Sequence, residues 1–157
     1  MGMQLSNPFM DSVRDILKQM ANIDVTVTNI ICSENDSIYS YGVSSIISCV
    51  GKIKGRLLLD MEQAVALAIA QNITGIYYTS VKEYMVLASI SEVNNIIAGN
   101  AVTMINNMYS LGLRLAPPIV FAGKDSVICI PKISSSSLDC TTRYGKMKIN
   151  VAFERSI

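Results

Sequence analysis

An acid and an amide stand one helical turn apart in the middle of the chain. Glu92 and Asn95 are three residues apart within an apolar repeat, and Gly99 follows one further turn along. Residues at this spacing share one face of a helix, so the three positions would lie in a row. A carboxylate can pair with a cation, and a carboxamide can both accept and donate hydrogen bonds. The row is therefore a candidate for docking and positioning chemistry, although a solvated helix face with an incidental glycine has the same pattern.

Gly99 gives a second reason to single out this row. Glycine inside a helix costs roughly 1 kcal/mol relative to alanine, so its presence requires an explanation. One explanation is the close approach of another surface beside the two polar side chains. The other is packing against a strand of the same chain. The local pattern leaves both open.

The chain contains no histidine. This absence removes the usual general base near neutral pH, the commonest metal ligand and every serine–histidine or cysteine–histidine nucleophile. The four cysteines form no C-x-x-C pair, and no glycine-rich phosphate loop of the form G-x-x-x-x-G-K-S/T is present. We therefore expect the chain to hold no metal and no cofactor of its own. Chemistry is left to carboxylates, amides and hydroxyls, or to groups of a partner.

Composition indicates one domain covering residues 1–157. Apolar residues make up 50% of the chain and charged residues 16%, with a net charge of +1. This balance disfavours disorder and provides no general basic surface for nucleic acid. The longest clean apolar run, residues 64–70, is far shorter than the roughly 18–20 residues that span a bilayer, and the N-terminus shows no secretory signal. With widely spaced cysteines that fit reduced core thiols, we expect a cytoplasmic protein that binds neither nucleic acid nor membrane.

Hydrophobic periodicity predicts helices and strands in a repeated order. Apolar residues three and four apart predict helices, whereas alternating or short apolar runs predict strands. The expected helices cover residues 7–20, 62–75 and 81–109, the last with a break near 88–91, and the expected strands cover residues 23–30, 44–51, 56–61, 113–123, 126–133 and 146–154. The polar stretches 32–42 and 134–145 are expected to form loops.

This order predicts an α+β fold with two layers. Two pseudo-repeated helix–strand halves would share one largely antiparallel sheet, with long helices packed on it. The last strand alternates cleanly and lies at a chain end, so we expect it to be an edge strand. An exposed edge can pair with a second copy of the chain unless charge blocks it, here through Lys146, Lys148 and Glu154.

The segment SEVNNIIAGNAV, followed by APP, resembles the signature of the CheC/CheX/FliY family of chemotaxis phosphatases. That signature is E-x-x-N, then 22 residues, then proline. Glu92 and Asn95 match it, and residues 96–117 are the 22 residues before Pro118. The segment NPFMDSVRDILKQM is similar to the start of CheX proteins, so the resemblance covers nearly the whole chain. One position departs from the pattern: Ala88 stands where the family usually has Asp or Ser, and we expect Ser89 to replace that polar contact in part.

The resemblance is closest to CheX, which implies a homodimer. CheC-like members commonly carry the E-x-x-N pair in both halves, whereas Asp15 and Lys18 stand at the corresponding positions of the first half here. Lysine cannot position a water molecule as a carboxamide can. We therefore expect a single site, in the second half of the chain.

The resemblance implies a phosphatase that acts on the aspartyl phosphate of a CheY-type response regulator. Such a regulator supplies Mg²⁺ and a lysine around its own phosphoryl group. By the same resemblance, Asn95 orients the attacking water and Glu92 pairs with the regulator's lysine. Ala98 and Gly99 are expected to keep the surface low enough for docking. Pro118 is expected to shape the entry to a strand and to take no part in the chemistry.

Two other functions stay open at this point. A CheX-like module could bind a response regulator or a scaffold without turnover. Ala88 favours this alternative, because it stands where the family usually has Asp or Ser. A dimer of the same fold with a purely structural role is the other.

Overall fold

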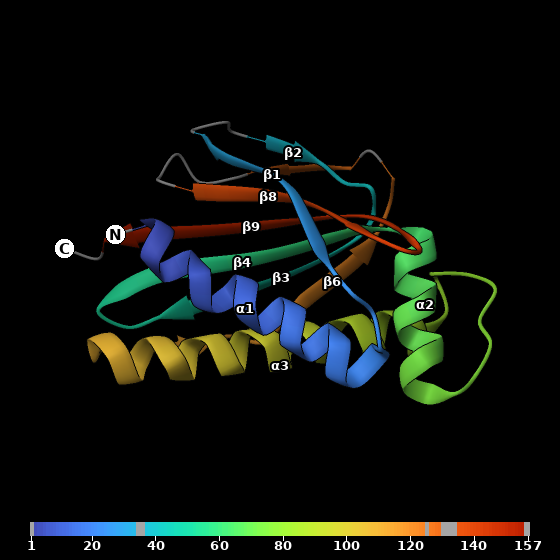
Figure 1. Ribbon diagram of the computed structural model, residues 1–157, viewed down its shortest axis with the longest axis horizontal. Helices are drawn as coiled ribbons and strands as arrows, with labels where there is room; N and C mark the ends of the chain where they lie inside the picture. The colour runs from blue at the N-terminus through green and yellow to red at the C-terminus, as the bar shows by residue number, and fades with distance from the viewer. Residues whose placement is uncertain (1, 34–36, 125, 130–134, 156–157) are drawn as a thin grey trace.

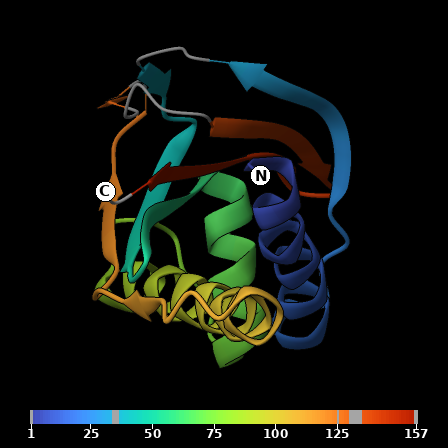
Figure 2. The same ribbon diagram turned by 90° about the vertical axis from the view of Figure 1, so that its left-hand side faces the viewer.

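A curved antiparallel sheet packs its concave side against the helices of the described chain (Figure 1, Figure 2). The computed structural model describes residues 2–33, 37–124, 126–129 and 135–155. Its helices are α1 (Gly2–Ala21), α2 (Gln63–Thr74) and α3 (Tyr84–Tyr109). Figure 2 shows the strands arching around α2, with α1 and α3 on the same concave side of the sheet.

The strands form one main sheet and one small sheet. They are β1 (Thr26–Ser33), β2 (Ser37–Tyr39), β3 (Gly42–Val50), β4 (Ile53–Glu62), β5 (Arg114–Leu115), β6 (Ile119–Ala122), β7 (Val127–Cys129), β8 (Ser135–Thr142) and β9 (Gly145–Arg155). The main sheet has the order β1-β8-β9-β4-β3-β5, and β6 also pairs with β3. Strands β2 and β7 pair separately, and all of these pairings are antiparallel.

The strand order confirms the two related halves. One half contains α1, β1, β2, β3 and β4, and the other contains α3, β6, β7, β8 and β9. Exchanging the halves leaves the order β1-β8-β9-β4-β3-β6 unchanged, because β4–β9 and β2–β7 each join equivalent strands. Helices α1 and α3 are therefore structural equivalents, which allows their surfaces to be compared position by position.

Alternation along the central strands separates the core face from an opposite face, which carries a polar row and a second apolar cluster that includes Leu58 of β4. Leu57 and Met61 of β4 are buried against the helices. On the opposite face, Ser44, Asp60 and Lys148 form one row across β3, β4 and β9. Successive side chains of a strand point to opposite faces, so one strand can serve both environments.

Asp60 is the centre of a buried hydrogen-bond cluster on this opposite face. Its Oδ1 accepts hydrogen bonds from the hydroxyls of Ser40 at 2.8 Å and Ser44 at 2.7 Å. Its Oδ2 accepts one from the backbone N–H of Tyr41 at 2.8 Å. Burial raises the pKa of Asp60 above its ordinary value of 3.8, while the hydrogen bonds act in the opposite direction. The cluster ties the segment before β3 to β4, and sequence analysis did not identify it.

Two predictions about the strands are wrong. Strand β9 is central and not an edge, because β4 pairs with it on one side and β8 on the other. Residues 135–142, expected to lie in a loop, form strand β8. Only Leu138 and Cys140 are apolar in this strand, and both face the core. The other strand face is polar, which concealed the strand in the sequence.

Other predicted segments also differ from the strands of the structure. The expected strand 113–123 divides into β5 and β6, and the expected loop 32–42 includes β2. The expected strand 126–133 contains β7, and residues 130–133 lie outside the described residues.

Helix α3 is continuous, so the predicted break near residues 88–91 is wrong. Ser89 fits inside the helix by donating its hydroxyl to the Met85 carbonyl at 2.7 Å. Helix α2 ends as predicted at Gly75, whose φ of 73° is left-handed and whose N–H donates to the Gln71 carbonyl at 2.8 Å. None of the described helices combines the length and the apolar character needed to cross a membrane.

The cysteines that can be described are core thiols, as predicted. Cys49 and Cys140 are free and buried. Burial raises the pKa of each to about 11, so both remain protonated at neutral pH. The side chains of Cys32 and Cys129 lie outside the described residues.

Candidate functional site

Polar contacts fix how α3 lies on the rest of the domain. Asn94 is fully buried and donates through Nδ2 to the hydroxyl of Ser45 in β3 at 2.9 Å. From α1, the Ser12 hydroxyl donates to the Ile97 carbonyl at 2.8 Å. Together with the apolar side chains that α3 buries, these contacts fix its rotation about its axis and so decide which of its side chains face solvent. Sequence analysis missed both, because a single buried polar residue carries no periodic signal.

Glu92 and Asn95 are exposed on the outer face of α3. They are three positions apart, which is slightly less than one helical turn, so both side chains project from the same side. Within the described part of the chain, neither makes a hydrogen bond or an ion pair. The acid and the amide therefore keep their bonding capacity for a group outside this domain.

The two small residues beside this pair differ from one another. Ala98 is 0% exposed and lies in the core, so the prediction that it borders a docking surface is wrong. Its position in the helical repeat turns it toward the body of the domain and away from the row of Glu92 and Asn95. Gly99 is half-buried and does lie next to that row.

Packing within the chain does not require a glycine at position 99. A Cβ atom added there would meet only the Leu115 Cδ1 atom, at 4.0 Å, which is ordinary van der Waals contact. Of the two explanations for Gly99, packing against a strand is thus the weaker. The bare backbone at this position faces outward beside Asn95.

The residues one turn before Glu92 give an apolar surface. Ala88 is half-buried, and Ser89 is 7% exposed. The Ser89 hydroxyl is directed to the carbonyl of Met85 in its own helix. The expectation that Ser89 replaces the family's usual polar contact is therefore wrong, because its hydroxyl points back to the helix backbone.

Pro118 lies immediately before β6, which pairs with β3 at the side of the main sheet. The chain approaches this strand through Ala116, whose N–H donates to the Ser48 carbonyl at 2.8 Å. Proline fixes its own φ angle and donates no backbone hydrogen bond, so it suits the start of an edge strand. This placement agrees with the predicted role in shaping the strand entry.

The equivalent face of α1 has different chemistry. Asp15 and Lys18 are exposed there, and Lys18 forms an ion pair with Asp24 with Nζ–Oδ1 at 3.2 Å. A lysine in an ion pair supplies neither an amide nor a free acceptor. The acid–amide pair is thus present on α3 and absent from the equivalent positions of α1.

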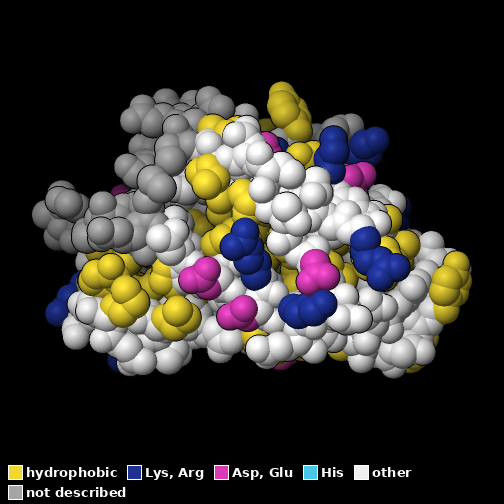
Figure 3. Space-filling model, viewed as in Figure 1, with side chains coloured by type: hydrophobic (Ala, Val, Ile, Leu, Met, Phe, Trp, Pro, Cys, Tyr) yellow, Lys and Arg dark blue, Asp and Glu magenta, His cyan; other side chains and the backbone are white. Residues whose placement is uncertain are grey.

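Charges of both signs are mixed across the face that carries α1. Figure 3 shows acidic and basic side chains interspersed there, with no large area of one sign. Apolar side chains gather on the left of this face, near the C-terminal end of α3 (Figure 3).

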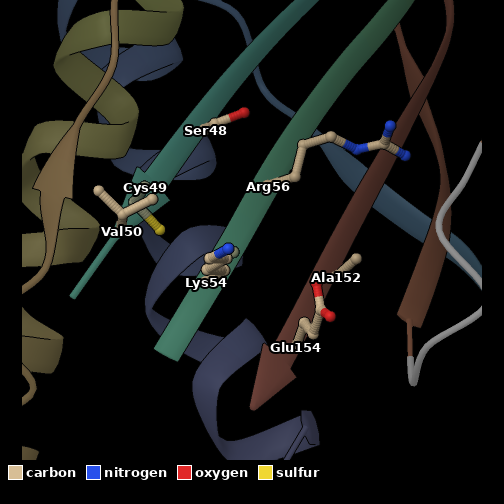
Figure 4. A pocket seen from close by; sticks show the side chains of 8 residues that line it. Ser48, Cys49, Val50, Lys54, Arg56, Ala152 and Glu154 are labelled. Carbon is tan, nitrogen blue, oxygen red and sulfur yellow. The ribbon is translucent and has the colours of Figure 1, made fainter. Parts of the chain in front are cut away.

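A cavity of about 210 Å³ opens on the helix-free face of the sheet (Figure 4). Val50, Lys54 and Arg56 contribute to it from β3 and β4, and Glu154 contributes from β9. Figure 4 shows the Arg56 side chain extending across β9. Because the sheet separates this cavity from the outer face of α3, it is no part of the acid–amide site.

Comparison with known families assigns the chain. A model of the family "Chemotaxis phosphatase CheX" matches residues 43–138, which include the acid–amide pair and the proline after it. The chain belongs to the CheX family. A search of curated proteins finds no match.

Solved structures of CheX and CheC-like proteins have the same fold. A CheC-like superfamily protein from Shewanella sp. PV-4 has a TM-score of 0.89 and 27% identity, covering 98% of this chain and 99% of that one. CheX from Vibrio vulnificus has a TM-score of 0.87 and 24% identity, covering 96% and 99%. A CheX–CheY–BeF₃–Mg²⁺ complex from Borrelia burgdorferi matches with a TM-score of 0.73 and 25% identity, covering 94% and 96%.

Proposed function

We propose that this CheX-family protein hydrolyses the aspartyl phosphate of a phosphorylated CheY-type response regulator. The observation that carries the proposal is the exposed pair Glu92 and Asn95 on one face of α3, in a chain of a chemotaxis phosphatase family. The complex of a B. burgdorferi CheX with CheY supports the choice of partner. A regulator that docks on α3 meets both side chains at once.

Asn95 is proposed to position the attacking water. Its carboxamide oxygen accepts a hydrogen bond from that water, and its Nδ2 donates toward a phosphoryl oxygen. Water attacks phosphorus in line, the bond to the aspartyl oxygen breaks, and the products are inorganic phosphate and the free carboxylate of the regulator. An amide is too weak a base to remove the proton, so its contribution is orientation.

Glu92 is proposed to pair with the regulator's active-site lysine. A carboxylate and an ammonium form a charge-assisted hydrogen bond that strengthens when docking excludes water. Because Glu92 and Asn95 lie on the same helix, the ion pair also fixes where the amide reaches. Gly99 allows the partner to approach the helix backbone beside Asn95.

Mg²⁺ is proposed to arrive with the regulator. The B. burgdorferi complex contains CheY, BeF₃ and Mg²⁺ together. A divalent cation on the regulator would neutralise charge on the phosphoryl oxygens. The CheX-family chain then adds water orientation and docking, for which one acid and one amide suffice.

The test is the decay of a phosphorylated CheY-type regulator in Mg²⁺, with catalytic amounts of protein. We expect Asn95→Ala to lower kcat by about 100-fold or more, as when a positioned transition-state group is removed. Asn100 is a matched control, because it is another exposed asparagine of α3. Asn100→Ala should keep wild-type turnover. Equal rates for Asn95→Ala and wild type would exclude the proposed role of Asn95.

A binding module without turnover is the second candidate function. The observation in its favour is the apolar surface at Ala88 and Ser89, where the family's flanking polar contact is missing. In that case the protein would change the lifetime of the phosphorylated regulator only at stoichiometric amounts. Multiple turnovers per protein molecule would exclude this candidate.

A homodimer is also proposed, as the resemblance to CheX implies. Strand β9 cannot supply its interface by edge pairing, because both of its edges are occupied within the chain. In the described chain, β1 lies at one end of the main sheet, and β5 and β6 lie at the other. Light scattering at micromolar concentration tests the oligomeric state, and a monomer mass would exclude the dimer.

A further inference from the structure

An apolar pocket of about 220 Å³ opens beside Glu92, where α1 and α2 end against α3. Glu92 itself forms part of the wall. The apolar residues of the wall are Met20, Ile73, Met85, Ala88 and Val93. The pocket is therefore continuous with the exposed acid of the candidate site.

The hydroxyl groups in the pocket wall are already engaged. Ser89 donates to the Met85 carbonyl at 2.7 Å, and Thr74 donates to the Ala70 carbonyl at 2.8 Å. These bonds direct the polar atoms to the helix backbones. Apart from the carboxylate of Glu92, the pocket thus offers an apolar surface, which is suited to an apolar group.

Ala88 keeps the pocket open on the side of the acid–amide pair. It precedes Glu92 by four residues and Asn95 by seven, so all three lie on one side of α3. A longer side chain at position 88 would enter the pocket, and a carboxylate there would make its wall polar. The residue at this position therefore decides whether the region beside Glu92 is a cavity or a polar contact.

We propose that this pocket receives an apolar side chain that the response regulator presents beside its phosphorylation site. The inference rests on the proposed function, because a regulator that brings its phosphoryl group to Asn95 and its lysine to Glu92 also covers the pocket. The flanking contact of this protein is then apolar, with Ala88 as the specificity-determining position.

The size of the pocket agrees with a single side chain. Small-molecule sites usually measure about 300–1,000 Å³, so this pocket is small for a ligand of drug size. Buried pockets that accept one apolar anchor are typical of protein interfaces. Met85, with 45% of its surface exposed, lies at the opening, and a flexible methionine can adapt to an inserted group.

The first test compares two methionines of α3. Met85 lines the pocket, whereas Met104 is similarly exposed at 41% and lies outside it. The measurement is the Kd for a CheY-type regulator activated with beryllofluoride and Mg²⁺. We expect Met85→Ala to raise Kd about tenfold, as for loss of an interface contact, and Met104→Ala to leave it unchanged. Equal Kd values for Met85→Ala and wild type would overturn the proposal.

The second test fills the pocket. Ala88→Leu should raise Kd by about tenfold or more because its side chain occupies the space of the incoming group. Thermal unfolding followed by circular dichroism confirms that the variant is folded. An unchanged Kd for a folded Ala88→Leu protein would show that nothing enters the pocket.

A serine at position 88 separates an apolar contact from a polar one. Ala88→Ser keeps the pocket nearly the same size, so an apolar contact predicts a Kd within about threefold of wild type. Clearly tighter binding would mean that the regulator presents a polar group here, and the proposal would fall.

The outcomes distinguish this inference from the proposed function. If wild type binds the activated regulator without hydrolysing phosphorylated regulator, the proposed function fails. The Kd values of the Met85 and Ala88 variants then still show whether the pocket receives a side chain of the regulator. If wild type hydrolyses and the Met85 and Ala88 variants keep its Kd, the proposed function stands and the pocket inference fails. Absence of any binding by wild type would overturn both.

Discussion

Glu92 and Asn95 extend from α3 into solvent, with no bonding partner in the described part of the chain. Both positions therefore contribute no visible bond to the fold, and both side chains are available for the docking role proposed for them. Asn94, between them in sequence, has the opposite role: it is fully buried and bonded to Ser45. Glu92 and Asn95 thus carry the proposed docking chemistry, whereas Asn94 attaches the helix to the sheet.

Charge reversal at Glu92 tests its proposed pairing with a lysine of the regulator. Glu92→Lys should weaken binding of beryllofluoride-activated regulator by at least 100-fold, because an attractive pair becomes a repulsive one. Isothermal titration calorimetry gives the Kd. Asp15→Lys is a matched control, because it makes the same charge change on the equivalent helix α1. An equal loss of affinity in both variants would indicate a general charge effect and not a specific pair.

Asp60 gives the protein a predictable dependence of stability on pH. Burial raises its folded pKa above 3.8, so the folded state binds the proton more tightly than the unfolded chain. The stabilisation is fully present below pH 3.8 and is lost as pH rises through the folded pKa. We expect the free energy of unfolding of wild type, relative to Asp60→Asn, to fall as pH rises through this window. Urea unfolding at a series of pH values measures it, and a rising difference would contradict the assignment.

At the scale of elements, contacts with the sheet and with α1 hold α3 in one orientation. Asn94 bonds to β3, and the Ile97 carbonyl accepts from Ser12 of α1. The helix is continuous from Tyr84 to Tyr109, so these attachments also hold the exposed turns that carry the acid–amide pair. A helix held in this way would let the proposed docking proceed without first ordering the site.

The Asn94–Ser45 hydrogen bond can be tested by a double-mutant cycle. Asn94→Ala should lower the free energy of unfolding by about 1–3 kcal/mol, because it leaves the buried Ser45 hydroxyl without this partner. Adding Ser45→Ala should cost less than the sum of the single changes, by about 1 kcal/mol. Urea unfolding curves give the values. Strict additivity would show that the two side chains do not interact.

For the whole molecule, the central position of β9 joins the two halves. It pairs with β4 of the first half and with β8 of the second. The interface between the halves is thus a continuous sheet and not a hinge. A dimer therefore cannot form by edge pairing at residues 147–152 of this strand, where both edges are occupied.

Proline substitutions distinguish a central strand from an edge strand. Residues 147–152 of β9 pair with β4 on one side and with β8 on the other, so proline should cost about 3 kcal/mol more than alanine at both Lys148 and Ile149. In the edge strand β1, alternate N–H groups point away from β8, so only one of Ile30 and Ile31 should show this excess. Thermal or urea unfolding gives the comparison. An excess at only one of the β9 positions would mean that one of its edges is free.

The sequence by itself determined the features that repeat along the chain. The 3.6-residue period predicted the helices, and the spacing of Glu92 and Asn95 placed both on one exposed face, as the structure has them. The motif formed with Pro118 indicated the family that the family model also gives. These signals are local, because each depends on residues within a few turns or at one fixed separation.

Only the tertiary structure decided which segments are neighbours. Strand β8 is serine-rich and resembles a loop in sequence, yet β1 and β9 on either side supply its hydrogen bonds. Burial of Ala98 and the bond of Asn94 to Ser45 depend on how α3 is rotated against the sheet. The pocket beside Glu92 exists because three helices converge there. Such features come from contacts between residues far apart in the chain, and no periodicity along the sequence records them.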